Sequence, residues 1–265
     1  MSHPQSKATI IANDYELLTE LKRLMWAASD AIMAVYNSED FGTEAKGDNS
    51  PVTIADLAAH HVLINGLSAL TPEIPVVSEE DAASVETGKS AGVYWLIDPL
   101  DGTKEFIKRN GEFTCNLALI EEKHTTLGFV TVPDKGNLYV GGTDYPSTVE
   151  SRGTKPQNIR HHKQDDVTRV VASKSHLNDD TKAFIAAIEG DVEIVQAGSS
   201  LKFLKIATGE ADIYPRLAPT CEWDTAAAHA VLKGAGGEVS QANGEPMIYG
   251  KDEILNPHFI ARALS

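Results

Sequence analysis

Two aspartates stand three residues apart, directly behind an apolar segment. Residues 95–103 read Trp-Leu-Ile-Asp-Pro-Leu-Asp-Gly-Thr. The run 93–97 predicts a buried strand, so Asp98 is expected at the carboxyl end of that strand, where ligands collect in layered α/β proteins. Pro99 fixes one backbone dihedral angle and offers no N–H group, which stiffens the turn. The pattern therefore predicts a tight turn that directs the carboxylates of Asp98 and Asp101 towards a common point.

Gly102 and Thr103 follow the second aspartate and are expected to begin a helix over 103–109. A glycine lets the backbone approach a ligand closely, and the free amides of a first helical turn attract an anion such as phosphate. The alternative is an ordinary helix cap, because Asp followed by Gly-Thr is common where a strand leads into a helix. The segment alone is compatible with both interpretations.

Acidic residues also stand at the ends of two other predicted elements. Glu79 follows the apolar run 74–77, which predicts a second strand, and Asp224 precedes an alanine-rich helical segment. Carboxylates that meet in a small volume repel one another or take up protons unless a cation binds between them. A divalent metal site is therefore expected. The candidate ligands are the side chains of Glu79, Asp98, Asp101 and Asp224, together with the main-chain carbonyl of Leu100.

The expected ligands are all oxygen atoms. No histidine or cysteine stands at a matching spacing, which favours Mg²⁺ or Mn²⁺ over zinc. The histidine pairs at 60–61 and 161–162 fall in a helical segment and in a polar connector, and neither pair is assigned a metal. The two cysteines lie far apart in the sequence and form no metal or redox motif, so we expect a reduced compartment, with Cys115 as a small core residue and Cys221 near the Asp224 segment.

Four segments of the chain resemble the signature motifs of the inositol monophosphatase superfamily of lithium-sensitive, magnesium-dependent phosphatases, and they follow one another in the same order as those motifs. Four motifs in the right order are a much more specific signal than one. The similarity extends over about 13–259 and is greatest to phosphatases that act on adenosine bisphosphate. It implies a layered αβαβα sandwich with antiparallel and mixed sheets. The matching segments are 48–56, 78–80, 95–103 and 223–227.

The resemblance also implies roles for individual residues. It implies two or three Mg²⁺ ions, with Mn²⁺ as an alternative, held by the five ligands named above. Asp56 and Thr103 match the pair that orients the attacking water in this superfamily. Asp56 also completes the capping pattern Thr53-x-x-Asp56 at the start of a helix predicted over 55–70, and the two roles are compatible.

The carboxyl-terminal half carries the residues that indicate the substrate. Ser199, Ser200 and Lys202 place two hydroxyls and a cation at the start of a predicted helix, an arrangement suited to an anion. His176 and Arg216 match in position the residues that bind the second phosphate and the ribose of adenosine bisphosphate. Taken singly, each would be interpreted as an ordinary surface residue. The predicted substrate-binding set is Gly102, Thr103, His176, Ser199, Lys202, Arg216 and Asp224.

The overall charge limits the classes of partner. Asp and Glu number 38 against 23 Lys and Arg, giving a formal net charge of −15. A surface this acidic argues against binding to nucleic acid, which requires a basic face. The sequence has neither a signal peptide nor an apolar run long enough to span a bilayer, so we expect a cytoplasmic protein without an obligatory membrane partner. Peripheral attachment to the inner membrane is left open, as is the choice between monomer and homodimer.

Two compact parts are expected. Polar residues over 150–166 indicate the division, with an amino-terminal α+β domain at 1–160 carrying most metal ligands and a carboxyl-terminal α/β domain at 161–265 carrying the nucleotide-binding residues and Asp224. Strands over 113–122, 126–132 and 137–142 are predicted to form an antiparallel meander. The segment 81–92 is predicted to be a loose connector.

The leading hypothesis is a magnesium-dependent phosphatase that removes the 3′-phosphate of adenosine 3′,5′-bisphosphate to leave AMP. Its sulfated precursor is a possible second substrate, which would link the protein to sulfur assimilation. Two alternatives are an inositol monophosphatase and a metal-dependent nucleotide-binding regulator without turnover. The cationic residues Lys202 and Arg216 favour the bisphosphate over inositol phosphate, because inositol-specific relatives tend to carry neutral or acidic residues at these positions.

Overall fold

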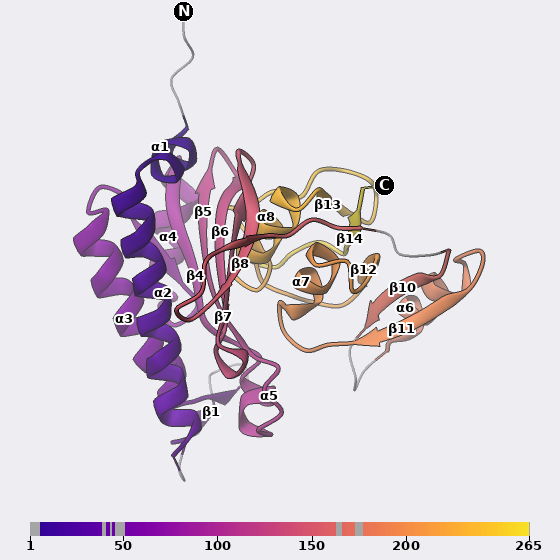
Figure 1. The fold of residues 1–265 in the computed structure, drawn as a ribbon, viewed down its shortest axis with the longest axis horizontal. Helices are drawn as coiled ribbons and strands as arrows, with labels where there is room; N and C mark the ends of the chain where they lie inside the picture. Colours follow the sequence, from indigo (N-terminus) through magenta and orange to yellow (C-terminus); the bar gives the residue numbers. More distant parts are fainter. Residues whose placement is uncertain are drawn as a thin grey trace, which may run out of the picture.

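Two large β-sheets alternate with layers of helices (Figure 1). The structure is a computed structural model, and it describes residues 6–38, 41–42, 44–45, 51–162, 166–172 and 177–264. The start of the first motif, 48–50, and His176 lie outside the described residues.

The larger sheet has seven strands in the order β3-β4-β5-β6-β7-β8-β9. Strands β3 and β4 are parallel, and all other neighbours in this sheet are antiparallel. The meander predicted from the sequence is confirmed as β5, β6 and β7. The strands are β3 (Val76–Ser78), β4 (Val93–Asp101), β5 (Thr114–Glu121), β6 (His124–Val132), β7 (Asn137–Gly142), β8 (Tyr145–Ser151) and β9 (Gln157–Asn158).

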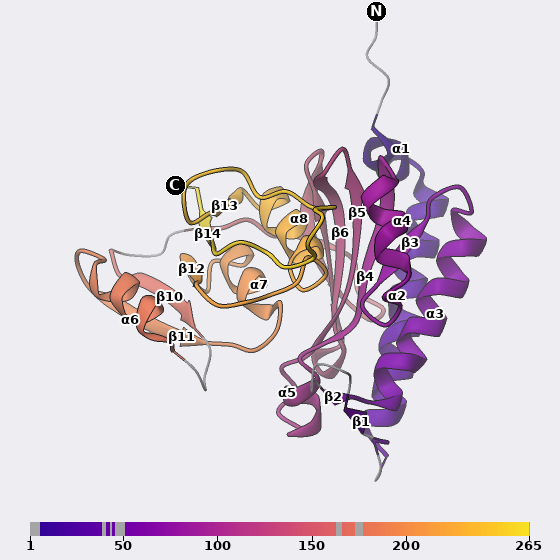
Figure 2. The same ribbon diagram turned by 180° about the vertical axis from the view of Figure 1, so that it is seen from behind.

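One face of this sheet is covered by the long helices α2 (Tyr15–Tyr36) and α3 (Ile54–Leu70), as Figure 2 shows from behind. Alternate strand residues such as Trp95 and Leu117 pack against these helices and are fully buried. Asp14 caps α2 by accepting a hydrogen bond from the amide of Leu17 at 3.0 Å. The short helix α1 (Lys7–Asn13) precedes α2.

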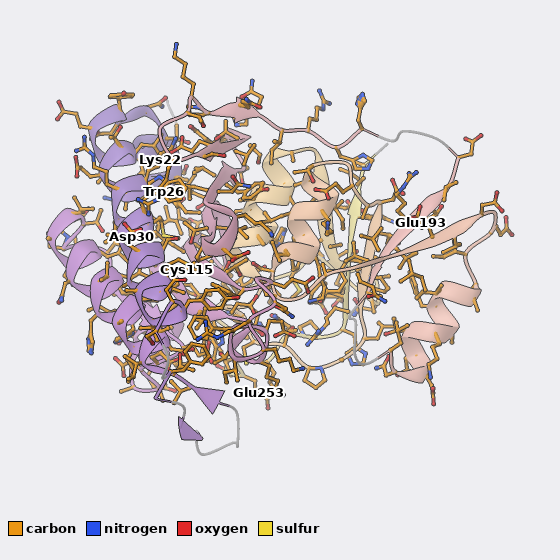
Figure 3. The ribbon with its side chains drawn as sticks, turned by 60° about the horizontal axis from the view of Figure 1, so that its bottom comes forward. Lys22, Trp26, Asp30, Cys115, Glu193 and Glu253 are labelled. Atoms are coloured by element: carbon orange, nitrogen blue, oxygen red, sulfur yellow. The ribbon has the colours of Figure 1, made fainter. Side chains whose placement is uncertain are left out.

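Polar side chains along one face of helix α2 also contact strand β8 and the residue that follows it. Lys22 forms an ion pair with Glu150 of β8 at 2.9 Å. The guanidinium of Arg152 lies 4.8 Å from the centre of the Trp26 ring and pairs with Asp30. Lys22, Trp26 and Asp30 follow one another along α2 at intervals of one helical turn, as Figure 3 shows.

The opposite face of the sheet packs against α7 (Leu201–Ala207) and α8 (Ala226–Gly234). Helix α8 is buried from Ala226 to Leu232. It lies so close to the sheet that a Cβ atom at Gly128 of β6 would come within 2.2 Å of a carbonyl oxygen of the helix, so only glycine fits there. Helix α8 therefore forms a buried central layer.

The second sheet has five strands in the order β11-β10-β12-β14-β13. Its β10 pairs in parallel with β11 and β12, and β14 pairs antiparallel with β12 and β13, so the sheet is mixed. Helices α7 and α8 separate the two sheets, and α6 (Asp179–Ala186) covers the outer side (Figure 1). The strands are β10 (Thr168–Ala172), β11 (Val192–Gln196), β12 (Ile213–Arg216), β13 (Gly237–Gln241) and β14 (Phe259–Ala263).

The order of layers is helix, sheet, helix, sheet, helix, and the predicted α/β sandwich is confirmed. The larger sheet ends at Asn158, and the smaller sheet begins at Thr168. The helical layer of α7 and α8 packs on strands of both sheets. The division into domains at 1–160 and 161–265 stays a prediction.

Two local expectations are wrong. Strand β4 does not end before Asp98 but continues to Asp101, with a register shift against β5 between these two aspartates. Pro99 falls within this irregularity, where its missing N–H group does not interrupt regular pairing. The segment predicted as a connector contains the helix α4 (Ser84–Ser90).

The remaining elements are short. They are β1 (Glu44–Ala45), β2 (Pro51–Val52), α5 (Thr103–Ile107) and a 3₁₀ turn at Pro133–Lys135. Among the described residues, no helix combines the length and the apolar character needed to cross a membrane.

Candidate active site

Three carboxylates from distant parts of the sequence meet at the end of β4. One oxygen from each of Glu79, Asp98 and Asp224 lies within 4.8 Å of the others. Glu79 follows β3, Asp98 belongs to β4, and Asp224 lies two residues before α8. The fold therefore brings together three of the four acids singled out in the sequence, and the fourth, Asp101, is close enough for its charge to act on Asp98 and Asp224.

The end of β4 is held by its own backbone. The amide of Leu100 donates to Asp98 Oδ1 at 3.1 Å, which fixes the orientation of this carboxylate. The carbonyl of Leu100 accepts a long hydrogen bond of 3.4 Å from the Thr103 hydroxyl. Gly102 has a φ of +92°, a left-handed conformation that favours glycine. The chain can thus turn sharply from β4 into α5, which is only five residues long.

Glu79 is placed by the residue before it. Ser78 is fully buried, and its hydroxyl lies 2.8 Å from His60 Nδ1 of α3 and accepts from the Glu80 amide at 3.2 Å. The amide of Glu79 donates to the carbonyl of Ile97 in β4 at 3.2 Å. His60 thus supports the acidic turn through Ser78, a contact that the sequence did not reveal.

Asp224 is held by a hydrogen bond within its own turn. Its Oδ2 accepts from the amide of Cys221 at 2.8 Å, so Cys221 lies near the site, as expected, through its backbone. The buried side chain of Asn256 spans this turn, donating to the Cys221 carbonyl at 2.7 Å and to the Thr225 hydroxyl at 3.1 Å. Glu222 is 1% exposed and pairs with Lys251.

The electrostatics of the acidic cluster are unfavourable without a cation. Burial raises the pKa of Asp98 well above its usual range, and the charges of Glu79, Asp101 and Asp224 raise it further. Burial raises the pKa of Asp224 to about 8, with Asp101 adding to the shift. Burial raises the pKa of Asp101 to about 6, although the nearby charge of Lys202 acts in the opposite direction. Like charges in a desolvated site oppose ionisation in this way.

The cluster fits a hard divalent cation. Asp98 Oδ2 is buried and has no hydrogen-bond donor among the described residues. Buried polar atoms are rarely left without a partner, and an unpartnered carboxylate oxygen among other carboxylates fits a bound cation. The donor set consists of carboxylates, which suit Mg²⁺ or Mn²⁺.

Asp56 and Thr103 come together at the amino end of α3. Asp56 is 2% exposed, and its Oδ2 accepts from both the amide and the hydroxyl of Thr53, at 2.8 and 2.7 Å. The predicted capping pattern is therefore confirmed as a capping box. The other oxygen, Oδ1, accepts from the Thr103 hydroxyl at 3.3 Å. The cap thus leaves one carboxylate oxygen directed at Thr103, so both predicted roles are geometrically compatible.

A cavity of about 330 Å³ lies beside the acids. It connects the metal side of the site with the smaller sheet, and it contains most of the residues predicted to bind substrate. Lys202, Tyr214 and Arg216 also line a smaller cavity next to it. The lining residues that belong to the predicted substrate-binding set are Gly102, Ser199, Lys202, Arg216 and Asp224, and the predicted metal ligand Asp101 also lines the cavity.

Lys202 is a cation whose charge acts on Asp101 and acts to lower the pKa of this carboxyl group, which burial raises. It is 6% exposed, so it does not extend into solvent from its helix. Its ammonium group donates to the Ser199 carbonyl at 2.9 Å and lies 5.5 Å from the centre of the Tyr214 ring. A lysine ammonium has three donors, and the Ser199 carbonyl takes one of them. Lys202 is therefore a fixed charge on the cavity wall.

Arg216 lies on the same wall but is partly committed to its own turn. Its Nε donates to the Ala218 carbonyl at 3.1 Å and its Nη2 to the Pro219 carbonyl at 2.5 Å. Its positive charge acts to lower the pKa of Asp224. Arg216 therefore shapes the cavity as well as contributing charge to it.

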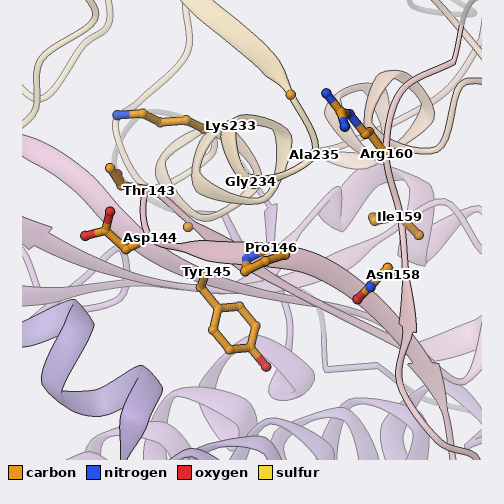
Figure 4. Close-up of a pocket in the computed structure, with 12 residues that line it drawn as sticks. Thr143, Asp144, Tyr145, Pro146, Asn158, Ile159, Arg160, Lys233, Gly234 and Ala235 are labelled. Carbon is orange, nitrogen blue, oxygen red and sulfur yellow. The ribbon is translucent and has the colours of Figure 1, made fainter.

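A larger cavity, of about 460 Å³, contains none of the predicted site residues. Its lining comes from the turn before β8 and from the end of α8, and it includes the cations Arg160 and Lys233 (Figure 4). Both side chains are exposed, and Asp144 is the carboxylate on its wall. Size alone therefore does not identify the site; the convergence of acids does.

Comparison with known proteins agrees with this geometry. The inositol monophosphatase family matches residues 14–264. The chain belongs to this family, whose enzymes are metal-dependent.

Within the family, the similar proteins include bisphosphate nucleotidases. The 3′(2′),5′-bisphosphate nucleotidase CysQ of Escherichia coli (strain K12) is 43% identical over 249 residues, which cover 92% of this chain and 98% of that protein. The protein of the same name from Buchnera aphidicola is 40% identical over 254 residues, 94% of each chain. The crystal structure of CysQ from Bacteroides thetaiotaomicron has a TM-score of 0.84 at 39% identity, covering 95% of this chain and 99% of that one.

Proposed function

We propose that this chain is a metal-dependent phosphatase that hydrolyses the 3′-phosphate of adenosine 3′,5′-bisphosphate, giving AMP and phosphate. The observation that carries the proposal is one cavity whose lining contains both signs of charge. The carboxylates of Asp101 and Asp224 and the cations Lys202 and Arg216 all line it. A substrate with two phosphates can place one at the proposed metal ligands and the other at these cations.

The acids would hold the metal that binds the reacting phosphate. Glu79, Asp98, Asp101, Asp224 and the Leu100 carbonyl are the proposed ligands of two or three Mg²⁺ ions, or of Mn²⁺ in their place. When bound, the metal neutralises the phosphate dianion and stabilises charge on the departing oxygen. Without a cation this part of the site repels phosphate, because its carboxylates carry the same sign of charge.

Asp56 and Thr103 orient the water that attacks phosphorus. Asp56 Oδ2 is held by Thr53, so Oδ1 is the oxygen that accepts from the Thr103 hydroxyl. With its proton directed at Asp56, the Thr103 oxygen keeps a lone pair that can accept a hydrogen bond from water. The pair thus aligns the attacking water. The Asp56 carboxylate can take up the proton of this water through the Thr103 hydroxyl.

Specificity for a second phosphate follows from Lys202. Its ammonium group is fixed by Ser199 and Tyr214, so little conformational freedom is lost when it binds an anion. Ser199 and the turn around Gly102 complete the pocket, and His176 belongs to the proposed set from its sequence position alone. The sulfated relative of the bisphosphate carries the same 3′-phosphate and is a second proposed substrate, which connects the protein to sulfur assimilation.

The remaining proposals concern the setting of the enzyme. A cytoplasmic location, a small-molecule nucleotide as the partner, and a monomeric or homodimeric state are predictions from the sequence, and each is open to direct measurement.

A substrate panel tests the function, with phosphate release measured in magnesium. The panel contains adenosine 3′,5′-bisphosphate, inositol 1-phosphate and a simple aryl phosphate. We expect the bisphosphate to have the highest kcat/KM by at least tenfold. The variant K202A should lose roughly 10- to 100-fold in kcat/KM for the bisphosphate and only a fewfold for the aryl phosphate, because one charge-assisted contact is removed.

Two results would contradict the proposal. Faster turnover of inositol phosphate would indicate an inositol monophosphatase, and equal losses on all substrates in K202A would exclude a second-phosphate pocket. Tight bisphosphate binding in magnesium without phosphate release would indicate a regulator.

A further inference from the structure

Strand β5 places two polar residues opposite the aspartates of β4. In the register of the larger sheet, Asn116 is the direct partner of Asp98, and Thr114 is the direct partner of Asp101. Direct partners on antiparallel strands point to the same face of a sheet. Thr114 is fully buried and Asn116 is 1% exposed. Buried polar groups are usually hydrogen-bonded, and here the Thr114 hydroxyl and Asn116 Oδ1 have partners, whereas Asn116 Nδ2 has none among the described residues.

These partners come from the turn that precedes α7. The Thr114 hydroxyl lies 2.9 Å from the Ser199 hydroxyl and 2.8 Å from the Ser200 hydroxyl. The Ser200 hydroxyl in turn donates to Asn116 Oδ1 at 3.0 Å. Ser200, Thr114 and Asn116 are at most 1% exposed, whereas Ser199 is half-buried and lines the cavity. This junction of three hydroxyls and one amide joins the larger sheet to the segment that carries Lys202.

The junction acts directly on a metal ligand. The backbone amide of Ser200 donates to Asp101 Oδ2 at 2.5 Å, so the position of the turn fixes the orientation of this carboxylate. The turn thereby holds one oxygen of Asp101, and the Ser199 side chain adds a further hydrogen bond to this carboxylate. Ser199 has a φ of +47°, a conformation that a residue with a side chain adopts only when its surroundings impose it. Hydrogen bonds hold this turn in place: the Ser199 hydroxyl bonds with Thr114, and the Ser200 hydroxyl bonds with Thr114 and donates to Asn116 Oδ1.

We propose that Thr114 and Asn116 are positioning residues for Asp101, acting through the Ser199–Ser200 turn. The inference rests on the proposed function in so far as Asp101 is a metal ligand. Neither residue touches the reacting phosphate. Their effect passes through Ser200 to the Asp101 carboxylate, as supporting residues around other metal sites orient the ligands they contact.

The same turn links both ends of the substrate cavity. The Ser199 carbonyl accepts from the Lys202 ammonium group at 2.9 Å, and the Ser200 amide holds Asp101. Two adjacent residues therefore set the separation between the metal site and the cation that receives the second phosphate. Loosening the junction should weaken magnesium binding and lower kcat on every phosphate ester, because Asp101 serves them all.

The test compares four single variants of the full chain: T114V, N116A, T114S and T131V. T114V removes the hydroxyl and keeps the shape of the side chain, whereas T114S keeps the hydroxyl. T131V is the matched control, because Thr131 is a fully buried threonine in the neighbouring strand whose hydroxyl has no nitrogen or oxygen partner among the described residues. The measurements are the magnesium dependence of phosphate release and, without any substrate, the magnesium dependence of the melting temperature.

We expect T114V to raise the magnesium concentration at half effect roughly tenfold in both measurements. T114S should lie near the wild type, and T131V should not shift the magnesium dependence. N116A should behave as T114V does, because it removes the acceptor for the Ser200 hydroxyl.

Two outcomes separate the possible failures. A T114V protein that melts earlier but keeps the wild-type magnesium midpoint would make the junction purely structural and overturn the inference. A wild-type protein that binds magnesium without hydrolysing the bisphosphate would overturn the proposed function, while the midpoint shift in T114V would still decide the role of the junction.

Discussion

The amino end of α3 and the carboxyl end of β4 each bury an aspartate, and they do so in opposite ways. Asp56 in α3 is 2% exposed, and both of its oxygens accept hydrogen bonds from threonines. Asp98 in β4 is 1% exposed, has one oxygen without a donor among the described residues, and faces other carboxylates. The chain itself stabilises the first charge, whereas it offers no such partner to the second, which we propose binds a cation.

This difference separates two functions that acidic residues serve in one site. A carboxylate already satisfied by hydrogen bonds is oriented and can direct water. A carboxylate with an unpaired oxygen among like charges is suited to binding metal. No hydrogen bond to that oxygen has to be broken first, so the free energy of metal binding is not reduced by such a loss. Substitutions by asparagine, which keeps the shape and removes the charge, should therefore have opposite effects on stability at the two positions.

The largest effect is expected for D98N. Removal of this charge should lower kcat/KM by about 1,000-fold or more, since an electrostatic element of the transition state is lost. The metal-free protein should become more stable and melt roughly 2–4 °C higher, because a buried and repelled carboxylate is gone. Thermal melting in a chelator checks the second claim, and a lower melting temperature would show that Asp98 is satisfied without metal.

A smaller loss of activity is expected for D56N. We expect kcat to fall about 100-fold with little change in KM, because a group that orients the nucleophile acts mainly in the transition state. Here the metal-free protein should lose about 1 kcal/mol of stability, the usual cost of a lost helix cap. T53A is the matched control, since it weakens the same cap without removing the carboxylate. If T53A lowers kcat as much as D56N does, the effect of D56N comes from the cap and not from catalysis.

The smallest effect concerns pH. The pKa values of Asp98, Asp101 and Asp224 are raised in the metal-free fold, the last two to about 6 and about 8. In the unfolded chain these groups ionise near pH 4. The metal-free fold therefore loses stability as pH rises from about 4 to 8, and magnesium restores it by binding the ionised forms.

The increase in melting temperature caused by magnesium should accordingly be larger at pH 8 than at pH 6. It should depend less on pH in D98N and remain pH-dependent in D56N. An increase that is equal at both pH values would mean that the acids are already ionised without metal.

The sequence predicts the acidic cluster well because its members end regular elements. Apolar runs before Glu79 and Asp98 mark strands, and the ends of neighbouring strands meet in space. The meander of β5 to β7 follows from alternating patterns separated by turn residues. In these places local periodicity is sufficient.

Features that depend on register or on packing were not predictable in this way. Thr114 and Asn116 have no motif of their own, and their importance comes from lying opposite Asp101 and Asp98. The contact between Lys202 of α7 and the Tyr214 ring joins a helix to the separate strand β12. The extension of β4 through Pro99 depends on a register shift that only the neighbouring strand defines. Such contacts join residues distant in sequence, so no local pattern records them.

The buried central helix has a consequence for how activity is lost on heating. Asp224 stands just before α8, which is buried between the two sheets. The Ala227 carbonyl of this helix packs closely against Gly128 of β6. Opening either sheet would release this helix and displace a ligand of the cluster at the same moment. We therefore expect catalysis and the fold to disappear together, with no partly melted form that still turns over substrate.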